Sequence, residues 1–497
     1  MARWNARYPF GTASAPERVG CRFGLIALPG VLAVSACAAG PDYHAPTPVA
    51  LGVPPRYSVL TDQSASDPSH RGSDPLWWNS FGDAELSRLE SEGLKSNLDI
   101  AVALSRLRQS REALIQARSA MVPTLSASGG YNRTQAIAGT TVSANSLSGN
   151  SLSLAADASY QVDIFGGRGR SIEAARADAE AGSFDYGAVA LTVQSSIATT
   201  YLQVRLQQTN LINAHLAQAN LAENLQIADW RNQAGLIGTL DVEQARTQLA
   251  QSAATIPQIE SSLSQAVAGL GVLLGRDPGA LRDELAASAP IPTGPADIAV
   301  GIPADVLRQR PDVRSAERSL AAATARIGVA KAQLYPALSL GGSIGTGAGS
   351  FANPFDVITG QAFATLAQTL FDGGRLRSLV RAQRDATDGA FATYKQSVLR
   401  ALQDTENAVV ALRAANQRQV QFDTALVSAN TSAILARLQY RRGLIDYPSL
   451  LITENLLITS RNGVAQARYD RAAALVQLYA ALGGGWTDQG PVTGQDK

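Results

Sequence analysis

Apolar and polar residues alternate strictly over residues 151–164. One face of this stretch carries Leu152, Leu154, Ala156, Ala158, Tyr160, Val162 and Ile164. A period of two over this length predicts a strand with one apolar and one polar face. Residues 124–132 alternate in the same way, and the residues between, 134–150, are rich in Ser, Gly, Asn and Thr. Residues 124–165 are therefore predicted to form a β-hairpin with a long polar loop.

A helical period follows this hairpin. From residue 171 to residue 232, apolar or small residues recur in steps of three and four without a proline. This pattern predicts one helix, about 93 Å long at about 1.5 Å per residue. After a break that contains Gly235, the stripe resumes at Val242 and continues to Leu273. Two such helices joined by a tight turn, residues 233–241, predict an antiparallel coiled-coil hairpin.

The whole arrangement then recurs along the chain. A helix predicted over residues 84–120 precedes the first hairpin, and one over residues 312–333 precedes a second hairpin at residues 337–371. In that second hairpin Leu338, Leu340, Gly342 and Ile344 are predicted to begin a strand. The Gly/Ser-rich residues 341–354 are predicted to form the loop, and residues 361–371 the returning strand. The long helix that follows breaks at Gly443-Leu444-Ile445, as the first breaks at Gly235-Leu236-Ile237. The chain is therefore predicted to be an internal duplication.

Both predicted hairpins end in a Gly-Gly-Arg turn, where a period of two gives way to the helical period. The glycines of these turns are Gly166, Gly167, Gly373 and Gly374. Glycine permits backbone conformations that a side chain would obstruct. We therefore predict that these four residues form the joints at which a strand becomes a helix.

These patterns divide the chain into two repeats and shorter flanking segments. The predicted segments are a leader (1–36), an N-terminal segment that starts with a loop-like tether (37–83), the first repeat (84–275), a Pro-rich connector (276–310), the second repeat (311–483, with a tip turn at 443–447) and a tail (484–497). A sheet that spans a bilayer must close on itself, and single-chain barrels have at least eight strands. Four strands cannot close, so several chains are predicted to share one barrel. The predicted fold class is an α+β membrane protein with long coiled-coil helices.

The leader has the features of an exported protein. Four arginines precede a twelve-residue apolar stretch, residues 23–34, which is too short to cross a bilayer as a helix. Val34-Ser35-Ala36-Cys37 follows, and it resembles a bacterial lipobox, in which the cysteine is acylated and becomes the first mature residue. Cys21 would then be removed with the leader. The alternative is an ordinary signal peptide with a cysteine near its cleavage site.

Composition and motifs argue against nucleic-acid binding and enzymatic chemistry. The formal net charge is +1, and 17% of residues are charged, so there is no basic footprint for nucleic acid. Gly341 to Gly345 match G-x-S-x-G, but His44, His70 and His215 all precede this motif, whereas a hydrolase triad needs a later histidine. No histidine pair has metal-ligand spacing, and no cofactor is expected.

Several motifs resemble one family of bacterial proteins. "ADVLRQRPDVRSAERSLAAATARIGVAKAQLYPALSL", residues 304–340, is similar to the central signature of NodT-type outer membrane factor lipoproteins of resistance-nodulation-division (RND) efflux systems, which are TolC-like. "WWNSFGDAEL", both Gly-Gly-Arg joints and the lipobox match as well. Arg310-Pro311-Asp312 is itself most simply interpreted as a helix start. The resemblance covers essentially the whole chain.

The resemblance implies an assembly and a function. It implies a homotrimer with a twelve-stranded barrel in the outer membrane of a Gram-negative bacterium, a helical barrel in the periplasm, and an equatorial belt made from the N-terminal segment, the connector and the tail. Such a duct is passive and exports small molecules. Its implied partners are an inner-membrane RND transporter, a periplasmic adaptor, and outer membrane lipid through acyl groups on Cys37.

The resemblance also assigns residues to the periplasmic tip. The tip corresponds to the two helix–helix turns, and Gly235, Leu236, Gly443 and Leu444 would contact the adaptor. Family members close their aperture with aspartates, tyrosine and arginine, and the matching candidates here are Asp241, Tyr440, Asp446 and Arg441. The alternative for Asp241 and Asp446 is that each is only a helix N-cap.

Two other functions remain open from the sequence. The first is the outer-membrane duct of a type I protein secretion system, which shares this architecture. The second is a periplasmic coiled-coil scaffold without a barrel.

Overall fold

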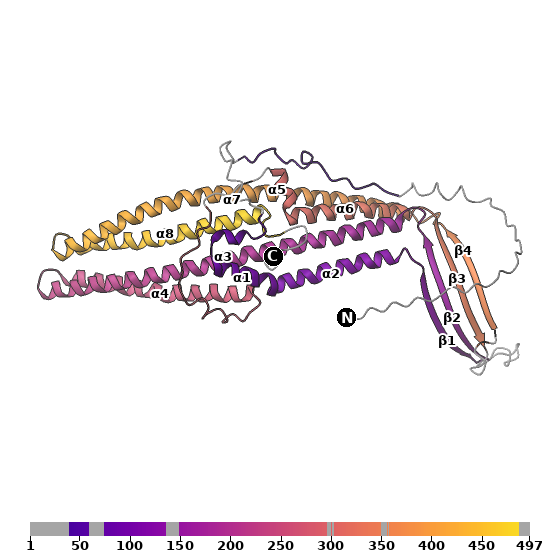
Figure 1. The fold of residues 1–497 in the computed structure, drawn as a ribbon, viewed down its shortest axis with the longest axis horizontal. Coiled ribbons are helices and arrows are strands. Elements are labelled where there is room, and N and C mark those ends of the chain that lie inside the picture. Colours follow the sequence, from indigo (N-terminus) through magenta and orange to yellow (C-terminus); the bar gives the residue numbers. More distant parts are fainter. Residues whose placement is uncertain are drawn as a thin grey trace, which may run out of the picture.

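The computed structural model describes residues 39–58, 74–135, 149–295, 300, 303–348, 355 and 357–486. Figure 1 shows an elongated molecule with four strands at one end and two helix–helix turns at the other. Two very long helices run between these ends. Predictions for Cys37, the leader and most of the C-terminal tail fall outside the described residues.

The two halves of the chain have matching elements. The first half contains η2 (Trp77–Phe81), α1 (Ala84–Ser96), α2 (Leu98–Ser119), β1 (Thr124–Thr134), β2 (Gly149–Val162), α3 (Gly167–Gln233) and α4 (Thr239–Leu273). The second contains α5 (Pro303–Gln309), α6 (Pro311–Ala332), β3 (Ala337–Ala348), β4 (Val357–Ala367), α7 (Arg375–Arg441) and α8 (Tyr447–Ala481). Helices α2 and α6 each have 22 residues, α3 and α7 each have 67, and α4 and α8 each have 35. Because three pairs agree in length, the duplication is confirmed.

The helix predicted over residues 84–120 is wrong in one respect, because it is divided at Asn97. Asn97 has an extended backbone, and its side-chain oxygen accepts hydrogen bonds from the N–H groups of Asp99 and Ile100. Its side-chain nitrogen donates to the carbonyl of Leu273 at 2.7 Å. Asn97 therefore starts α2 and also joins it to the end of α4.

The four strands form one antiparallel sheet in the order β1-β2-β3-β4. The prediction that Leu338, Leu340, Gly342 and Ile344 begin a strand is confirmed. The prediction that residues 341–354 form a loop is wrong for residues 341–348, which also belong to β3. Gly341 pairs with Phe363 of β4, and a Cβ at Gly341 would lie 2.3 Å from the Phe363 ring. The glycine therefore makes room for an aromatic ring in the sheet. The returning strand also begins and ends earlier than predicted, at Val357 and Ala367.

One face of the sheet is apolar and exposed. The register places Tyr160 opposite Leu340 and Ala156 opposite Ile344, so the apolar residues of neighbouring strands share a face. The exposed large side chains of this face are Leu125, Tyr131, Leu154, Leu340, Ile344, Ile358 and Leu366. Every residue of β1 and β4 is exposed. Within the described part of the chain nothing covers this surface, and both edge strands are unpaired.

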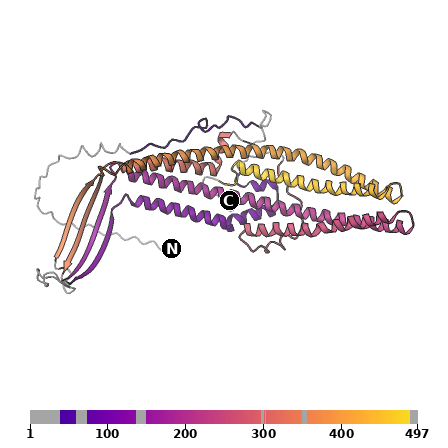
Figure 2. The same ribbon diagram turned by 180° about the vertical axis from the view of Figure 1, so that it is seen from behind.

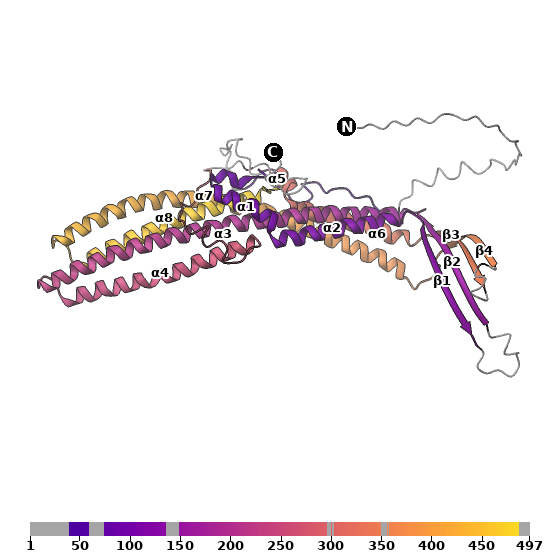
Figure 3. The same cartoon turned by 60° about the horizontal axis from the view of Figure 1, so that its bottom comes forward.

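The helices pack in two stacked sets around α3 and α7. Near the sheet, α6 lies between α3 and α7, and α2 packs on the other side of α3. Toward the tip, α8 lies between α3 and α7, and α4 packs on the other side of α3 (Figure 1). The views in Figures 2 and 3 show α4 beside α3 and α8 beside α7 as two helix hairpins. None of the described helices is both long enough and apolar enough to cross a bilayer.

The largest hydrophobic core lies at mid-length, where η2 and α1 cover α3 and α8. Trp77, Trp78 and Tyr479 are almost fully buried there, and the rings of Trp77 and Tyr479 stack with centroids 5.3 Å apart. Buried polar bonds attach the connector to this core. The guanidinium of Arg471 donates to the carbonyls of Thr293 and Pro295.

The segment that follows Cys37, predicted as a loop-like tether, is packed along the helices over residues 39–58. Ala39 donates its N–H to the carbonyl of Phe165 at 3.0 Å, and Gly40 lies so close to Gly328 that a Cβ would be 2.5 Å from the Gly328 Cα. Arg170 of α3 is buried and pairs with Asp42. The segment ends at Ser58, which bonds to Glu406 of α7. It therefore crosses from the first repeat to the second.

Candidate functional site

The two helix–helix turns at the tip have the same geometry. Gly235 and Gly443 have φ of 70° and 74°, a left-handed conformation that strongly favours glycine. The next residue in each turn donates its N–H back into the last helical turn, Leu236 to the Arg231 carbonyl and Leu444 to the Gln439 carbonyl. Leu236 and Leu444 are each 68% exposed. The tip thus presents an exposed leucine side chain at the end of each hairpin.

An apolar cluster lies directly behind these turns and contains residues from all four helices. Its buried members are Ala228, Val242, Ala245, Ala436, Tyr440, Tyr447 and Leu450. The rings of Tyr440 and Tyr447 meet edge to face, with centroids 5.9 Å apart. This cluster fixes the position of each candidate aperture residue.

Tyr440 is a packing residue on the inside of this cluster. It is 1% exposed, and its hydroxyl has no hydrogen-bond partner of good geometry among the described residues. Burial raises the pKa of Tyr440, and burial raises that of Tyr447 to about 12, with nearby Asp241 adding to both shifts. Both phenols therefore stay neutral at physiological pH.

The two aspartates have different environments. Asp446 is the N-cap of α8 and accepts a hydrogen bond from the N–H of Ser449 at 3.1 Å; hydrogen bonding from Ser449 lowers the pKa of Asp446. The N-cap of α4 is Gly238, so capping is the wrong interpretation for Asp241. Asp241 lies in the first turn of α4, is partly buried, and acts on Tyr440 and Tyr447 by its charge. Asp241 is therefore a carboxylate without a capping role beside the tip cluster.

Arginines connect the two hairpins, and sequence reasoning named only one of them. Arg441 forms an ion pair with Glu223 of α3. Arg231, at the end of α3, donates from Nη1 to the Tyr440 carbonyl at 2.9 Å, and its guanidinium carbon lies 4.7 Å from the centroid of the Tyr440 ring. Arg437, by contrast, acts within the α7–α8 hairpin, where its Nη2 lies 2.7 Å from Oε2 of buried Glu454. The signal that could have found Arg231 is a basic residue in the last turn before a tip glycine.

The predicted strand-to-helix joints lie at the other end of α3 and α7. Gly166 and Gly374 are the N-caps of these helices and, like Gly373, have left-handed backbones, with φ of 73°, 89° and 64°. Gly167 is the first residue of α3, and a Cβ there would lie 2.7 Å from the Cβ of Ala332. Glycine is thus required at Gly167 by close packing and at the other three residues by conformation.

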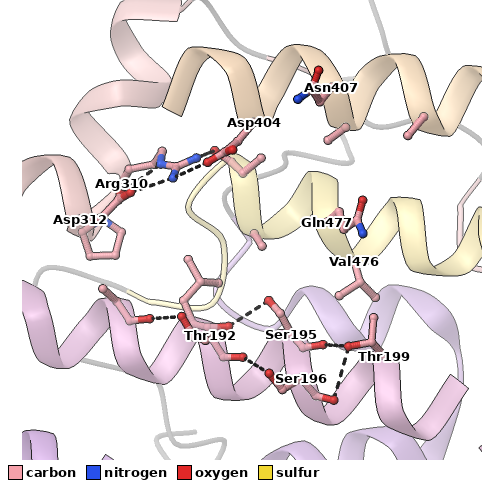
Figure 4. A pocket seen from close by; sticks show the side chains of 17 residues that line it. Thr192, Ser195, Ser196, Thr199, Arg310, Asp312, Asp404, Asn407, Val476 and Gln477 are labelled. Atoms are coloured by element: carbon pink, nitrogen blue, oxygen red, sulfur yellow. Dashed lines mark hydrogen bonds and ion pairs between the residues drawn. The ribbon is translucent and has the colours of Figure 1, made fainter. Parts of the chain in front are cut away.

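A cavity of about 650 Å³ lies at mid-length, where α8 ends and α6 begins between α3 and α7 (Figure 4). Arg310, the N-cap of α6, is buried and donates to the Ala481 carbonyl at 3.1 Å and to the carboxylates of Asp312 and Asp404. Pro311 is the first helical residue, so the helix-start interpretation of this motif is confirmed. Arg310 joins α6 to α8 as Asn97 joins α2 to α4. The Arg310-Pro311-Asp312 motif thus has a structural role, because it connects the start of α6 to the end of α8.

Comparisons with known proteins give matches over nearly the whole chain. The family model described as outer membrane efflux protein matches residues 89–276 and 302–484. The pyoverdine export outer membrane protein OpmQ of Pseudomonas aeruginosa is 30% identical over 466 residues, which cover 92% of this chain and 95% of that protein. Nodulation protein T of Rhizobium leguminosarum bv. viciae is 31% identical over 465 residues, 92% of each chain.

The fold is also similar to a solved structure. The outer-membrane channel OprN aligns with a TM-score of 0.82 at 29% identity, and the alignment covers 90% of this chain and 99% of that one. The residues that the family model matches include both tip turns, all four strands and both strand-to-helix joints.

Proposed function

We propose, on the premise that this chain belongs to the outer membrane efflux protein family, that three copies close into one passive duct through the outer membrane. The chain is an outer-membrane channel of a tripartite efflux pump, with a TolC-like fold. The observation that supports the trimer is the open sheet, with two unpaired edges and a bare apolar face. Three copies supply twelve strands, which suffice for a closed barrel.

The long helices continue this wall away from the membrane. Because α3 begins a few residues after β2, and α7 a few residues after β4, every second strand leads directly into a helix more than half the length of the molecule (Figure 1). We propose that these helices enclose a periplasmic tunnel. A periplasmic adaptor and an inner-membrane RND transporter would load it with small molecules. The relative named for pyoverdine export supports this cargo over protein secretion. The exposed apolar face of the sheet argues against a periplasmic coiled-coil scaffold without a barrel.

Asp241 is proposed as the aperture residue of the tip. It is an aspartate without a capping role, and it lies next to the buried tyrosines that anchor the two hairpins. In a trimer three such carboxylates would face one another around a narrow opening, where they would attract cations and accept hydrogen bonds from neighbouring chains. Asp446, which caps α8, is assigned to helix stability.

The channel and its aperture are tested together by single-channel recording. Purified protein in planar bilayers is expected to conduct with a small unitary conductance. Asp241→Ala is expected to raise this conductance several-fold, because the hydrogen bonds that the carboxylates would accept from neighbouring chains, and that would keep the opening narrow, are lost. Asp446→Ala is the matched control: it should lower stability slightly through loss of the cap and leave conductance unchanged. An Asp241→Ala conductance equal to that of the wild type would assign the aperture to other residues.

We further propose that Cys37 carries the lipid anchor. Ala39, two residues later, is held at the end of β2 by its bond to Phe165 and by Arg170. Two residues span at most about 7 Å, so acyl groups on Cys37 would meet the membrane at the level where the strands end. Packing of residues 39–58 supports an anchor at a fixed height.

Cys37→Ala is expected to abolish incorporation of radioactive palmitate, because it removes the acylated thiol. Cys21→Ala is the control and should leave the label unchanged, since Cys21 is removed with the leader. Label that persists in Cys37→Ala would contradict the lipoprotein assignment.

A further inference from the structure

The cavity at mid-length lies on the side of α3 that the hydrophobic core does not cover. Gln194 faces the core, because its amide donates to the Gly485 carbonyl at 3.1 Å, beside the Trp77 ring. Thr192 and Ser196, which line the cavity, come two residues before and two residues after Gln194. Two residues turn a helix by about 200°. The side chains of Thr192 and Ser196 therefore point away from the core.

Helix α7 has the same arrangement. Asp404 lines the cavity, whereas Glu406, two residues later, accepts hydrogen bonds from Ser58 at the end of the packed segment 39–58. In the proposed trimer the mid-length core and residues 39–58 can lie only on the outside, because inside they would block the tunnel. The cavity therefore opens toward the tunnel.

The α3 wall of this cavity offers hydrogen-bond acceptors. The hydroxyl groups of Thr192, Ser195, Ser196 and Thr199 each donate to a carbonyl one turn earlier in the same helix (Figure 4). A hydroxyl group has one hydrogen and two lone pairs, so a hydroxyl whose hydrogen is engaged can only accept a further bond. A ligand that binds to this wall must therefore donate hydrogen bonds.

The opposite wall has a negative charge. Asp404 accepts a hydrogen bond from Arg310 at its Oδ2, at 3.1 Å, and its Oδ1 has no donor among the residues that the structure describes. Arg310 also binds the carboxylate of Asp312. One guanidinium thus serves two carboxylates, which leaves one negative charge (Figure 4). The Asp404 side chain is 53% exposed, so Oδ1 is accessible from the cavity.

The rest of the lining is mostly apolar and small. The volume of about 650 Å³ lies within the range of about 300–1,000 Å³ that is typical of small-molecule sites. Such sites combine an apolar wall with a few polar groups that orient the ligand. The apolar residues of the lining include Ala188, Leu191, Ala411, Val476 and Ala480.

We propose that this cavity binds organic ammonium molecules with an apolar body as they pass through the tunnel, one in each chain. The ammonium group would donate to Oδ1 of Asp404 and to the hydroxyl oxygens of α3. The apolar body would lie against the small side chains of the lining. An anionic molecule would meet acceptors and a negative charge, so the cavity selects against it. The site rests on the proposed trimeric channel.

Equilibrium binding of 9-aminoacridine, a fluorescent organic cation, to the purified full-length protein tests the site by fluorescence anisotropy. The wild type is expected to bind one molecule per chain. Asp404→Asn should weaken binding at least about tenfold, because a charge-assisted hydrogen bond is lost. Asparagine keeps an oxygen for Arg310, so the wall is preserved. Ala411→Trp keeps both carboxylates but fills the cavity from an exposed position, and it should abolish binding.

Two controls separate this site from general attraction of cations. Asp388→Asn removes an exposed carboxylate of α7 that does not line the cavity, and its affinity should equal that of the wild type. Acridine has the same rings without the amino group and is uncharged at neutral pH. It should bind more weakly than 9-aminoacridine, and Asp404→Asn should not change its affinity.

Unchanged affinity for 9-aminoacridine in Asp404→Asn would overturn the site, as would an equal loss in Asp388→Asn. Conductance of the same preparations in planar bilayers tests the channel separately. A wild-type protein that conducts but does not bind the probe would overturn this inference alone. A protein that neither forms trimers nor conducts would overturn the proposed function, and with it the site in the tunnel wall.

Discussion

Replacing Leu154 and Ile344 with arginine is expected to abolish the outer-membrane form of the protein. Both side chains lie on the exposed apolar face of the sheet, 39% and 59% exposed, near the middle of β2 and β3. An arginine at the bilayer midplane of a barrel costs about 2–4 kcal/mol. Six of them in a trimer cost about 12–24 kcal/mol, at least as much as the whole stability of many domains. Heat-modifiable oligomer in purified outer membranes should fall below detection.

Ser153→Arg is the matched control. Ser153 precedes Leu154 in β2, so its side chain is on the other face of the sheet, and its partners on the neighbouring strands are Gly130 and Gly347. An arginine there would point into the water-filled interior, so insertion should be close to that of the wild type. Equal loss of insertion from Ser153→Arg would contradict the assignment of the two faces. Normal insertion of Leu154→Arg/Ile344→Arg would contradict the barrel itself.

The second large effect is expected at the tip. Leu236→Asp/Leu444→Asp should reduce drug tolerance to that of a deletion strain while the oligomer still assembles. The two leucines are largely exposed at the ends of the hairpins and belong to none of the buried clusters of the described residues. They are suited to an apolar contact with an adaptor, and six added charges per trimer would oppose that contact. Tolerance assays combined with cross-linking to the adaptor would measure both steps.

Glu243→Gln is the control for this prediction. Glu243 is also exposed near the tip, and its carboxylate contacts Arg246 one turn away. Efflux should remain normal in this variant. If Leu236→Asp/Leu444→Asp keeps normal tolerance, the adaptor engages another part of the duct.

Much of this fold follows from hydrophobic periods, because strands and helices impose different ones. The change of period at Gly166 and Gly374 located both joints, and the repeated breaks at Gly235 and Gly443 located the tip. The break at Asn97 escaped detection because the apolar stripe continues through it; only the end of α4, distant in sequence, provides the carbonyl that Asn97 binds. The glycine-rich part of β3 was predicted as loop since glycine is typical of turns, whereas Gly341 accommodates a ring from the neighbouring strand.

The contacts of the predicted aperture residues could not be predicted from the sequence. The resemblance places Asp241, Tyr440, Asp446 and Arg441 at the tip, but their positions in the sequence do not show which groups each side chain meets. Asp446 caps α8, Tyr440 is buried, and Arg441 pairs with Glu223, more than two hundred residues earlier. Arg231 could be assigned only when α3 and α7 were seen side by side.

The duplication gives the duct both a nearly regular wall and an irregular tip. Equal helix lengths allow the two repeats to alternate around one ring. Differences between equivalent residues, such as Tyr440 and Asn232, distinguish the two repeats at the tip.

The mass of the intact complex tests the central claim most directly. Four strands per chain require three chains to reach twelve, so native mass spectrometry of protein extracted from outer membranes should give a complex of three copies. A stable complex of one or two copies, or a protein recovered only from the soluble periplasm, would contradict the shared barrel and with it the proposed duct.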